Sequence, residues 1–421
     1  MKLKINRSDL HGAIRIPASK SHTIRAVALA GIADGKSVLK NPLYSADTIS
    51  CIEGIQEFGA EVSQTSDLII SGTGGLPKTS CKKIDVGNSG TSLRILTGLA
   101  SLADFPIIFD GDSSIRKRPM FPLLSALQQL GASVQSTNGK CPFTITGPIR
   151  GGRTIVNGIS SQFVTSLLLA CPLAKEDTEI IVENLYEKPY VEITLDWLRK
   201  LGISFEQDEL SRFLIKGGQK YGAFSRSIPA DFSSATFAAC AASITNSEVL
   251  IKGLDFSDHQ GDKEIFTFLR QMGVKLEHTS DGVLIKGGDL TGIDIDMNNT
   301  PDALPAFAVV GCLAKGTTRL LNVAQARLKE CDRISSIANE LTKMGAKIEE
   351  LEDGLVIHQS TLKGAEVDGY NDHRMVMALS VAGMTAEGET MVDTAESYRI
   401  TYPGYVDDMR AIGASIEVVK D

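Results

Sequence analysis

One short pattern recurs six times along this 421-residue chain and limits what the chain can fold into. In each copy an apolar residue is followed by glycine, then by Ala, Ile or Val, and then by an alternating run that is typical of a strand. The glycines are Gly59, Gly131, Gly202, Gly273, Gly345 and Gly413, with spacings of 72, 71, 71, 72 and 68 residues. Each one follows a helical pattern and stands where a glycine typically ends a helix. The repeat therefore predicts six similar units in which a helix leads into a strand.

A second signal keeps the same period. Small polar residues precede an Ala- or Leu-rich helix at Lys20-Ser21, Gly90-Thr91, Ser160-Ser161, Ser233-Ser234, Thr300-Pro301-Asp302 and Asn371-Asp372. Further helices are expected to begin near Asp47, Arg118, Tyr190, Gly261, Arg333 and Thr401. Each unit thus contains two helices and several strands, and six units in a chain of this length favour two domains of three units. The N-terminus of a helix presents unpaired N–H groups. Helices that begin at the same position in each repeat are therefore suited to bind anions.

The composition restricts the class of protein. With 43% hydrophobic and 22% charged residues, the chain is typical of a soluble globular protein. The apolar runs 163–174 and 303–314 are too short to cross a membrane, so we expect buried helices there, and the N-terminus has no signal-peptide pattern. A net charge of −8 argues against nucleic acid as a partner. The seven cysteines are scattered and the six histidines are not clustered, which favours a reducing cytoplasm without disulfides or metal sites.

Polar and basic residues gather at the predicted helix starts of the first half. The segment 19–25 places Lys20, Ser21 and Arg25 where they suit a phosphate or carboxylate, although a capped surface helix explains them equally well. The glycines of segment 87–94 let the backbone approach a ligand closely, and an ordinary strand-to-helix turn is the alternative. The basic run in segment 113–120 is either solvated or directed to the same face as the other helix starts.

The second half contains the stronger candidates. In the segment 299–303, Thr300 is a suitable N-cap and Asp302 suits the first helical turn, so a purely structural account is open there. Charges are dense in the segment 326–333, between core residues. The segment 371–374 places a histidine and an arginine directly before an apolar helix, which favours contact with a ligand.

Seven motifs occur in order along essentially the whole chain: S-K-S-x-x-x-R, G-N-S-G-T, R-K-R-P, S-S-Q, P-D-A, R-x-K-E-x-D-R and N-D-H-R. Several are weak alone, whereas all of them in register are highly specific. On these motifs the chain resembles the 5-enolpyruvylshikimate-3-phosphate synthase family (3-phosphoshikimate 1-carboxyvinyltransferases). The resemblance implies a two-domain inside-out α/β barrel with six βαβαββ-like repeats, three per domain, and the repeat described above agrees with it independently.

The resemblance also implies domain limits and an activity. Residues 1–17 and 229–421 would form the C-terminal domain, residues 18–228 the N-terminal domain, and the active site would lie in the cleft between them. The enzyme would transfer the enolpyruvyl group of phosphoenolpyruvate to the 5-hydroxyl of shikimate-3-phosphate and release phosphate. This reaction belongs to the shikimate pathway, which leads to chorismate and the aromatic amino acids. We expect a cytoplasmic monomer that needs no metal or organic cofactor and has no nucleic-acid or membrane partner.

The resemblance assigns three sets of residues. The catalytic set is Asp302 as the base for the acceptor hydroxyl, Glu330 as the acid for the methylene carbon, and Lys20. The acceptor would be bound by Ser21, Arg25, Ser160, Ser161, Gln162, Tyr190, Gln325 and Lys329. Phosphoenolpyruvate would be bound by Lys20, Gly90, Arg118, Gln162, Arg333, Arg374 and Arg399.

Three positions depart from the family pattern. Glu187 stands where the family usually has Ser, Gln325 where Asn is usual, and Ile400 where a lysine contacts phosphoenolpyruvate, with Arg399 as the nearest substitute. We expect Glu187 to turn away from the acceptor's phosphate, toward Lys188 or another basic residue. Two alternatives stay open: the same transfer to a different cyclic alcohol, and an inactive paralogue that only binds. The sister transferase for UDP-N-acetylglucosamine is disfavoured because it has Lys-Asn where this chain has Lys20-Ser21.

Overall fold

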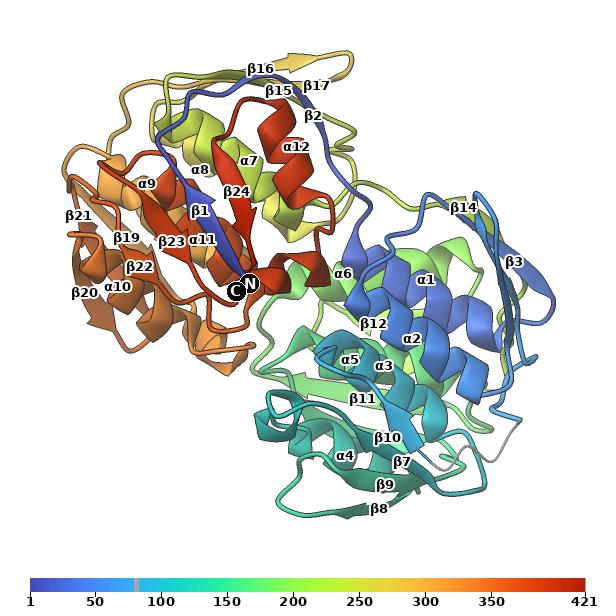
Figure 1. Ribbon diagram of the computed structural model, residues 1–421. Helices are drawn as coiled ribbons and strands as arrows, with labels where there is room; N and C mark the ends of the chain where they lie inside the picture. The colour runs from blue at the N-terminus through green and yellow to red at the C-terminus, as the bar shows by residue number, and fades with distance from the viewer. Residues whose placement is uncertain (79–82, 421) are drawn as a thin grey trace. The chain divides into compact units, whose positions relative to one another are not determined.

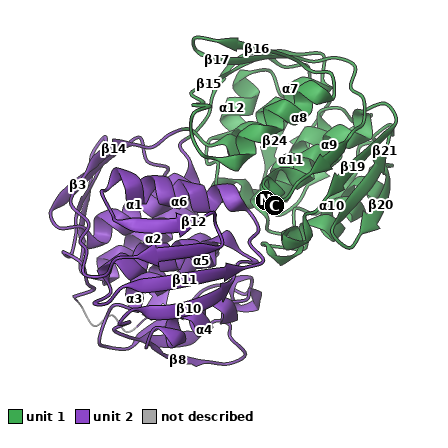
Figure 2. Cartoon of the chain, turned by 180° about the vertical axis from the view of Figure 1, so that it is seen from behind, with its two compact units in different colours: residues 1–17, 230–421 green, residues 18–229 purple. Residues whose placement is uncertain are grey.

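The computed structural model describes residues 1–78 and 83–420. These residues form two compact units (Figure 2): unit 1 comprises Met1–Pro17 and Ala230–Asp421, and unit 2 comprises Ala18–Pro229. The domain boundary expected between residues 228 and 229 is one residue from the boundary between Pro229 and Ala230.

Unit 2 alternates helices and strands along the chain, as the coloured ribbon of Figure 1 shows. Its helices are α1 (Lys20–Ile32), α2 (Ala46–Glu57), α3 (Gly90–Ala100), α4 (Phe121–Gln129), α5 (Ser161–Ala170) and α6 (Lys188–Lys200), with 3-10 turns η1 (Ile115–Lys117) and η2 (Cys171–Leu173). Its strands are β3 (Lys36–Lys40), β4 (Glu61–Gln64), β5 (Leu68–Ser71), β6 (Lys83–Asp85), β7 (Ile107–Asp110), β8 (Ser133–Ser136), β9 (Phe143–Thr146), β10 (Gly152–Asn157), β11 (Thr178–Glu183), β12 (Phe205–Asp208), β13 (Arg212–Ile215) and β14 (Ser225–Ser227).

Unit 1 is built from the same alternation. Its helices are α7 (Phe232–Ile244), α8 (Ile265–Gln271), α9 (Leu304–Leu313), α10 (Arg333–Lys343), α11 (His373–Gly383) and α12 (Tyr405–Ala411), with 3-10 turns η3 (Gly261–Glu264), η4 (Pro301–Ala303), η5 (Ala324–Leu328) and η6 (Ala395–Ile400). Its strands are β1 (Lys2–Ile5), β2 (His11–Arg15), β15 (Glu248–Lys252), β16 (Lys275–Thr279), β17 (Gly282–Lys286), β18 (Asp294–Asp296), β19 (Thr317–Leu321), β20 (Lys347–Leu351), β21 (Gly354–His358), β22 (Glu366–Val367), β23 (Thr390–Val392) and β24 (Ile416–Val419).

Among the described residues each unit has three four-stranded sheets, and every sheet follows one topology. In the sheet β6-β7-β9-β8, the first two strands are parallel and the last two form an antiparallel hairpin. The parallel pair is connected through α3, and α4 leads from β7 into the hairpin, which makes a βαβαββ unit. The predicted α/β fold with six such repeats, three per domain, is confirmed.

Strands from distant parts of the sequence complete three of the sheets. β14 pairs in parallel with β3, and β2 pairs in parallel with β15. In the last sheet β1 lies between β23 and β24 and is antiparallel to both. The sixth repeat ends the chain after one strand, so β1 supplies the strand that its hairpin lacks and covers edges that would otherwise be open.

The repeat glycines act as predicted. Gly59, Gly131, Gly202, Gly273, Gly345 and Gly413 each follow the C-cap of a helix and have φ between 73° and 107°. Residues with a Cβ rarely adopt this left-handed conformation, which explains why glycine stands at this position in each repeat.

The first helix of each repeat is buried on nearly all sides. In α5 and α9 almost every residue is buried, so the prediction of core helices in the two apolar runs is confirmed. No helix in the described part of the chain is long and apolar enough to cross a membrane. Because these helices lie inside their units, polar side chains at their N-termini are held by defined neighbours.

Candidate active site

The first predicted residues of unit 2 lie at the start of α1. The Lys20 Nζ is 3.0 Å from Asp47 Oδ2, and both side chains are largely buried. The Arg25 guanidinium, one turn on, is buried and donates to the Ser21 and Tyr190 backbone oxygens, both at 2.9 Å. Burial lowers the pKa of Arg25 to about 10, against the opposing effect of Tyr190. Arg25 therefore remains a cation at neutral pH that fastens the starts of α1 and α6 to each other.

A second group of side chains surrounds the start of α3. Arg118 Nη2 donates to Asn88 Oδ1 at 3.0 Å and to Ser114 Oγ at 3.1 Å. Arg94 Nη1 donates to Gln162 Oε1 at 2.6 Å. A Cβ placed on Gly90 would lie 2.7 Å from Arg118 Nη1 and 2.8 Å from Arg94 Nη1. The absence of a side chain at Gly90 thus allows two guanidinium groups to approach the N-terminus of α3.

The third group lies at the start of α5. Ser160 is the N-cap and Ser161 the first helical residue. Ser161 Oγ donates to Glu187 Oε2 at 2.9 Å, and the Glu187 side chain is buried. The expectation that Glu187 turns away from this helix start is therefore wrong. The neighbouring Lys188 is exposed.

Unit 1 contains a compact cluster of charges around Arg333, the first residue of α10. Its guanidinium is 2.7 Å from Asp302 Oδ1, 2.7 Å from Glu330 Oε2 and 2.8 Å from Asp372 Oδ2. Burial disfavours the charge of Arg333, but Asp372, Glu330 and Asp302 outweigh that effect and raise its pKa well above the usual value. We call Arg333, Arg374, Asp302, Glu330 and Asp372 the unit 1 cluster.

Within the unit 1 cluster, Asp302 joins two arginines. Its second oxygen, Oδ2, is 3.1 Å from Arg374 Nη2. The Nε and Nη1 atoms of Arg374 are buried and have no hydrogen-bond partner among the described residues. Buried N–H groups are normally paired, so a guanidinium in this state is suited to receive an anion. Asp302 keeps 19% of its side-chain surface exposed and Glu330 keeps 12%, whereas Asp372 has none, so only the first two are open to a ligand.

A model of the EPSP synthase (3-phosphoshikimate 1-carboxyvinyltransferase) family matches residues 5–409 of the chain. The chain belongs to this family. A relative from Acetivibrio thermocellus named 3-phosphoshikimate 1-carboxyvinyltransferase is 49% identical over the full length of both chains. A relative of the same name from Methanocaldococcus jannaschii is 44% identical over 99% of each. The fold is also similar to a solved structure of EPSP synthase from Acinetobacter baumannii, with a TM-score of 0.83 at 27% identity and full coverage of both chains.

The remaining residues that were assigned from the EPSP synthase family lie at the margins of these groups. Gln325 is buried in η5 and its Nε2 donates to the Asn298 backbone oxygen at 3.0 Å. Lys329 follows η5 and is half-buried beside Glu330. Arg399 is exposed in η6, with its guanidinium carbon 5.6 Å from the centre of the Tyr398 ring. In the described part of the chain no hydrogen bond or ion pair joins Arg399 to the unit 1 cluster, so its assignment rests on the sequence alone.

Several partners of these residues were not singled out from the sequence. Asp47 binds Lys20, Arg94 binds Gln162, and Asp372 binds Arg333. Arg94 and Asp372 lie in the segments 87–94 and 371–374, so the sequence marked the right stretches without showing which side chain faces inward. Thr300, expected to cap its helix, makes no side-chain cap, and its hydroxyl is 3.8 Å from Met297 Sδ. A purely structural account of the P-D-A motif is correspondingly weaker.

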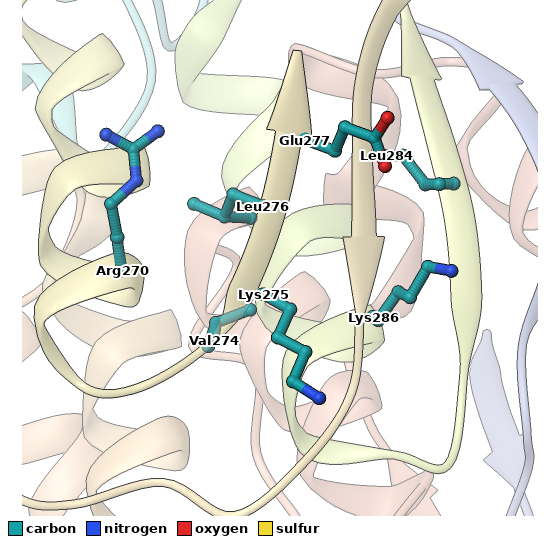
Figure 3. Close-up of a pocket in the computed structure, with 7 residues that line it drawn as sticks. All are labelled: Arg270, Val274, Lys275, Leu276, Glu277, Leu284 and Lys286. Carbon is teal, nitrogen blue, oxygen red and sulfur yellow. The ribbon is translucent and has the colours of Figure 1, made fainter. Parts of the chain in front are cut away.

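A cavity of about 580 Å³ lies elsewhere in unit 1. It is lined by Arg270, Val274, Lys275, Leu276, Glu277, Leu284 and Lys286. Figure 3 shows these side chains on α8, on the hairpin β16–β17 and, for Val274, on the connection between them. None of them belongs to the motifs shared with the EPSP synthase family or to the unit 1 cluster. The cavity is therefore no part of the candidate site.

Proposed function

We propose that the chain transfers the enolpyruvyl group of phosphoenolpyruvate to the 5-hydroxyl of shikimate-3-phosphate and releases inorganic phosphate. Membership of the EPSP synthase family over nearly the whole length supports this reaction. At the level of residues, one observation supports the reaction most directly: the buried Arg333 and Arg374 both contact the carboxylate of Asp302. This arrangement places a proton acceptor directly beside two cations that suit a phosphorylated, carboxylated substrate.

In the proposed mechanism, Asp302 takes the proton of the acceptor hydroxyl as its oxygen bonds to C2 of phosphoenolpyruvate. Glu330 gives a proton to the methylene carbon C3, and a tetrahedral intermediate results. The methyl group then returns a proton to the Glu330 carboxylate as the bond between C2 and the phosphate oxygen breaks, which restores the double bond. The proton held by Asp302 passes to the released phosphate, so both carboxylates are regenerated. General acid–base groups and fixed cations are the two contributions that this addition–elimination needs from the protein.

The cations have a separate task. In the proposal the unpaired Nε and Nη1 atoms of Arg374, together with Arg333, bind the carboxylate or phosphate of phosphoenolpyruvate. Lys20, Arg118 and Gln162 serve the same substrate, and the serines at the starts of α1 and α5 serve the acceptor.

The decisive experiment measures phosphate release when the protein is mixed with phosphoenolpyruvate and each member of an acceptor panel. We expect release with shikimate-3-phosphate and none with UDP-N-acetylglucosamine. Release with another cyclic alcohol alone would replace the acceptor in this proposal. Binding of the substrates without release in any mixture would indicate the inactive paralogue. The retained Asp302 and Glu330 in contact with Arg333 argue against that last outcome.

The Gly90→Ala substitution should affect phosphoenolpyruvate selectively. The added Cβ would stand 2.7 Å and 2.8 Å from the tips of Arg118 and Arg94, so both flexible side chains must shift while the backbone does not. We expect the KM for phosphoenolpyruvate to rise about tenfold, which corresponds to about 1.4 kcal/mol. The melting temperature and the KM for shikimate-3-phosphate should change little. An equal rise in both KM values would contradict the assignment of Arg118 to phosphoenolpyruvate.

We further propose that the enzyme works as a monomer in a reducing compartment. The six described cysteines are free, which supports a reducing environment. Light scattering coupled to size exclusion tests the first point, since a monomer has a mass of 45.1 kDa.

A further inference from the structure

The most unusual group at the candidate acceptor site is the carboxylate of Glu187. This residue stands directly before α6 and has a φ of 55°, a left-handed conformation that a non-glycine residue rarely adopts. Its exposed fraction is 2%, and its Oε2 accepts the hydroxyl proton of Ser161 at 2.9 Å. The protein thus places an anion of its own against the first residue of α5.

The Glu187 carboxylate and an anion that binds at the start of α5 would both need the hydroxyl proton of Ser161. A serine hydroxyl has one proton to donate, so Ser161 cannot donate to Glu187 and to a phosphate oxygen at the same time. A carboxylate and a phosphate held by the same serine would also repel each other strongly in a buried setting. Either the carboxylate leaves Ser161 when an anion binds there, or the anion binds without Ser161.

We propose that Glu187 is a specificity-determining residue that competes with the phosphate of the acceptor for Ser161. This inference rests on the proposed function, in which Ser160 and Ser161 bind the acceptor, and it takes the bound part of the acceptor to be its phosphate. Binding of the phosphorylated acceptor displaces the Glu187 carboxylate from Ser161, and the displacement lowers the affinity for that acceptor. An acceptor without a phosphate leaves the Ser161–Glu187 hydrogen bond in place and is not penalised.

The test compares two ligands that differ only in the phosphate. Calorimetry measures the dissociation constants of shikimate-3-phosphate and of shikimate for the unmodified protein and for Glu187→Gln. The glutamine keeps the size of the side chain and an oxygen that accepts from Ser161, but it carries no charge. We expect the dissociation constant of shikimate-3-phosphate to fall by about tenfold or more and that of shikimate to change by less than about threefold, with tenfold equal to about 1.4 kcal/mol.

Glu183→Gln is the matched control. Glu183 ends β11, four positions before Glu187 in the chain, and is exposed, so this variant removes the same charge from the same region without touching Ser161. It should leave the ratio of the two dissociation constants unchanged. Glu187→Ser is the second test variant, because it removes the carboxylate and most of its volume; its gain for shikimate-3-phosphate should equal or exceed that of Glu187→Gln. Thermal unfolding of each variant verifies that the fold is retained.

The possible results separate cleanly. An unchanged or weaker affinity for shikimate-3-phosphate in both Glu187 variants, or an equal gain for both ligands, would overturn the inference. The proposed function fails by a different result, namely no phosphate release from phosphoenolpyruvate and shikimate-3-phosphate with the unmodified protein. If release occurs while the Glu187 variants show no selective gain, the reaction stands and only the role of Glu187 is rejected.

Discussion

Replacement of Asp302 by asparagine should lower kcat by about two to four orders of magnitude, the range expected for loss of a general base. The asparagine keeps an oxygen for Arg333 or Arg374, which Asp302 contacts at 2.7 Å and 3.1 Å, but it cannot take up the acceptor's proton. The KM for shikimate-3-phosphate should therefore change far less than kcat. Steady-state kinetics with phosphate release as the readout measures both quantities.

The matched control for this variant is Asp296→Asn. Asp296 ends β18, is exposed and accepts hydrogen bonds from the Asn298 amide and the Asn322 side chain, so its loss perturbs the same segment without touching the arginines. It should retain near-normal turnover. If Asp302→Asn also retained it, Asp302 would be a structural residue of η4 and the reaction would need another base.

The fold could be predicted because the signals that define it are local. A glycine at the C′ position, a polar helix start and an alternating strand each depend on a few consecutive residues, and all of them recur about every 70 residues. The pairing of β1 between β23 and β24 is different. It joins residues at opposite ends of the chain, and residues 1–17 were assigned to the C-terminal domain through the family resemblance, not through any local pattern.

The candidate site could be predicted only in part, for a related physical reason. Motifs identify side chains that are chemically unusual for their position, such as Asp302 and Arg333. The partners that hold them are fixed by packing between distant segments: Asp372 lies 39 residues from Arg333 in sequence, and Gln162 lies 68 residues from Arg94. No local pattern contains such pairs.

Glu187 shows how a local argument fails. The rule that a carboxylate turns to the nearest cation assumes that both side chains are free to meet in solvent. At Glu187 the backbone is left-handed and the side chain is buried against Ser161, while the adjacent Lys188 is exposed.

Replacement of Arg333 by glutamine should have the largest combined effect on stability and activity. The variant leaves Asp372, which has no exposed side-chain surface, without the guanidinium that contacts both of its oxygens. Removal of one partner from a buried ion pair typically costs about 3–5 kcal/mol. We expect a loss of this size in the free energy of unfolding, measured by urea titration, and a loss of about two to three orders of magnitude in kcat, as for removal of a group that stabilises developing charge.

A second substitution separates the two roles of this arginine. In Arg333→Gln/Asp372→Asn the buried charge is gone, and two amide side chains replace the ion pair by neutral hydrogen bonds. Most of the lost stability should return, because the cost of the single variant is chiefly that of an uncompensated buried carboxylate. Turnover should remain as low as in Arg333→Gln, since neither amide carries the positive charge that the leaving phosphate requires. Recovery of turnover together with stability would mean that Arg333 serves the fold alone and that Arg374 supplies the charge for catalysis.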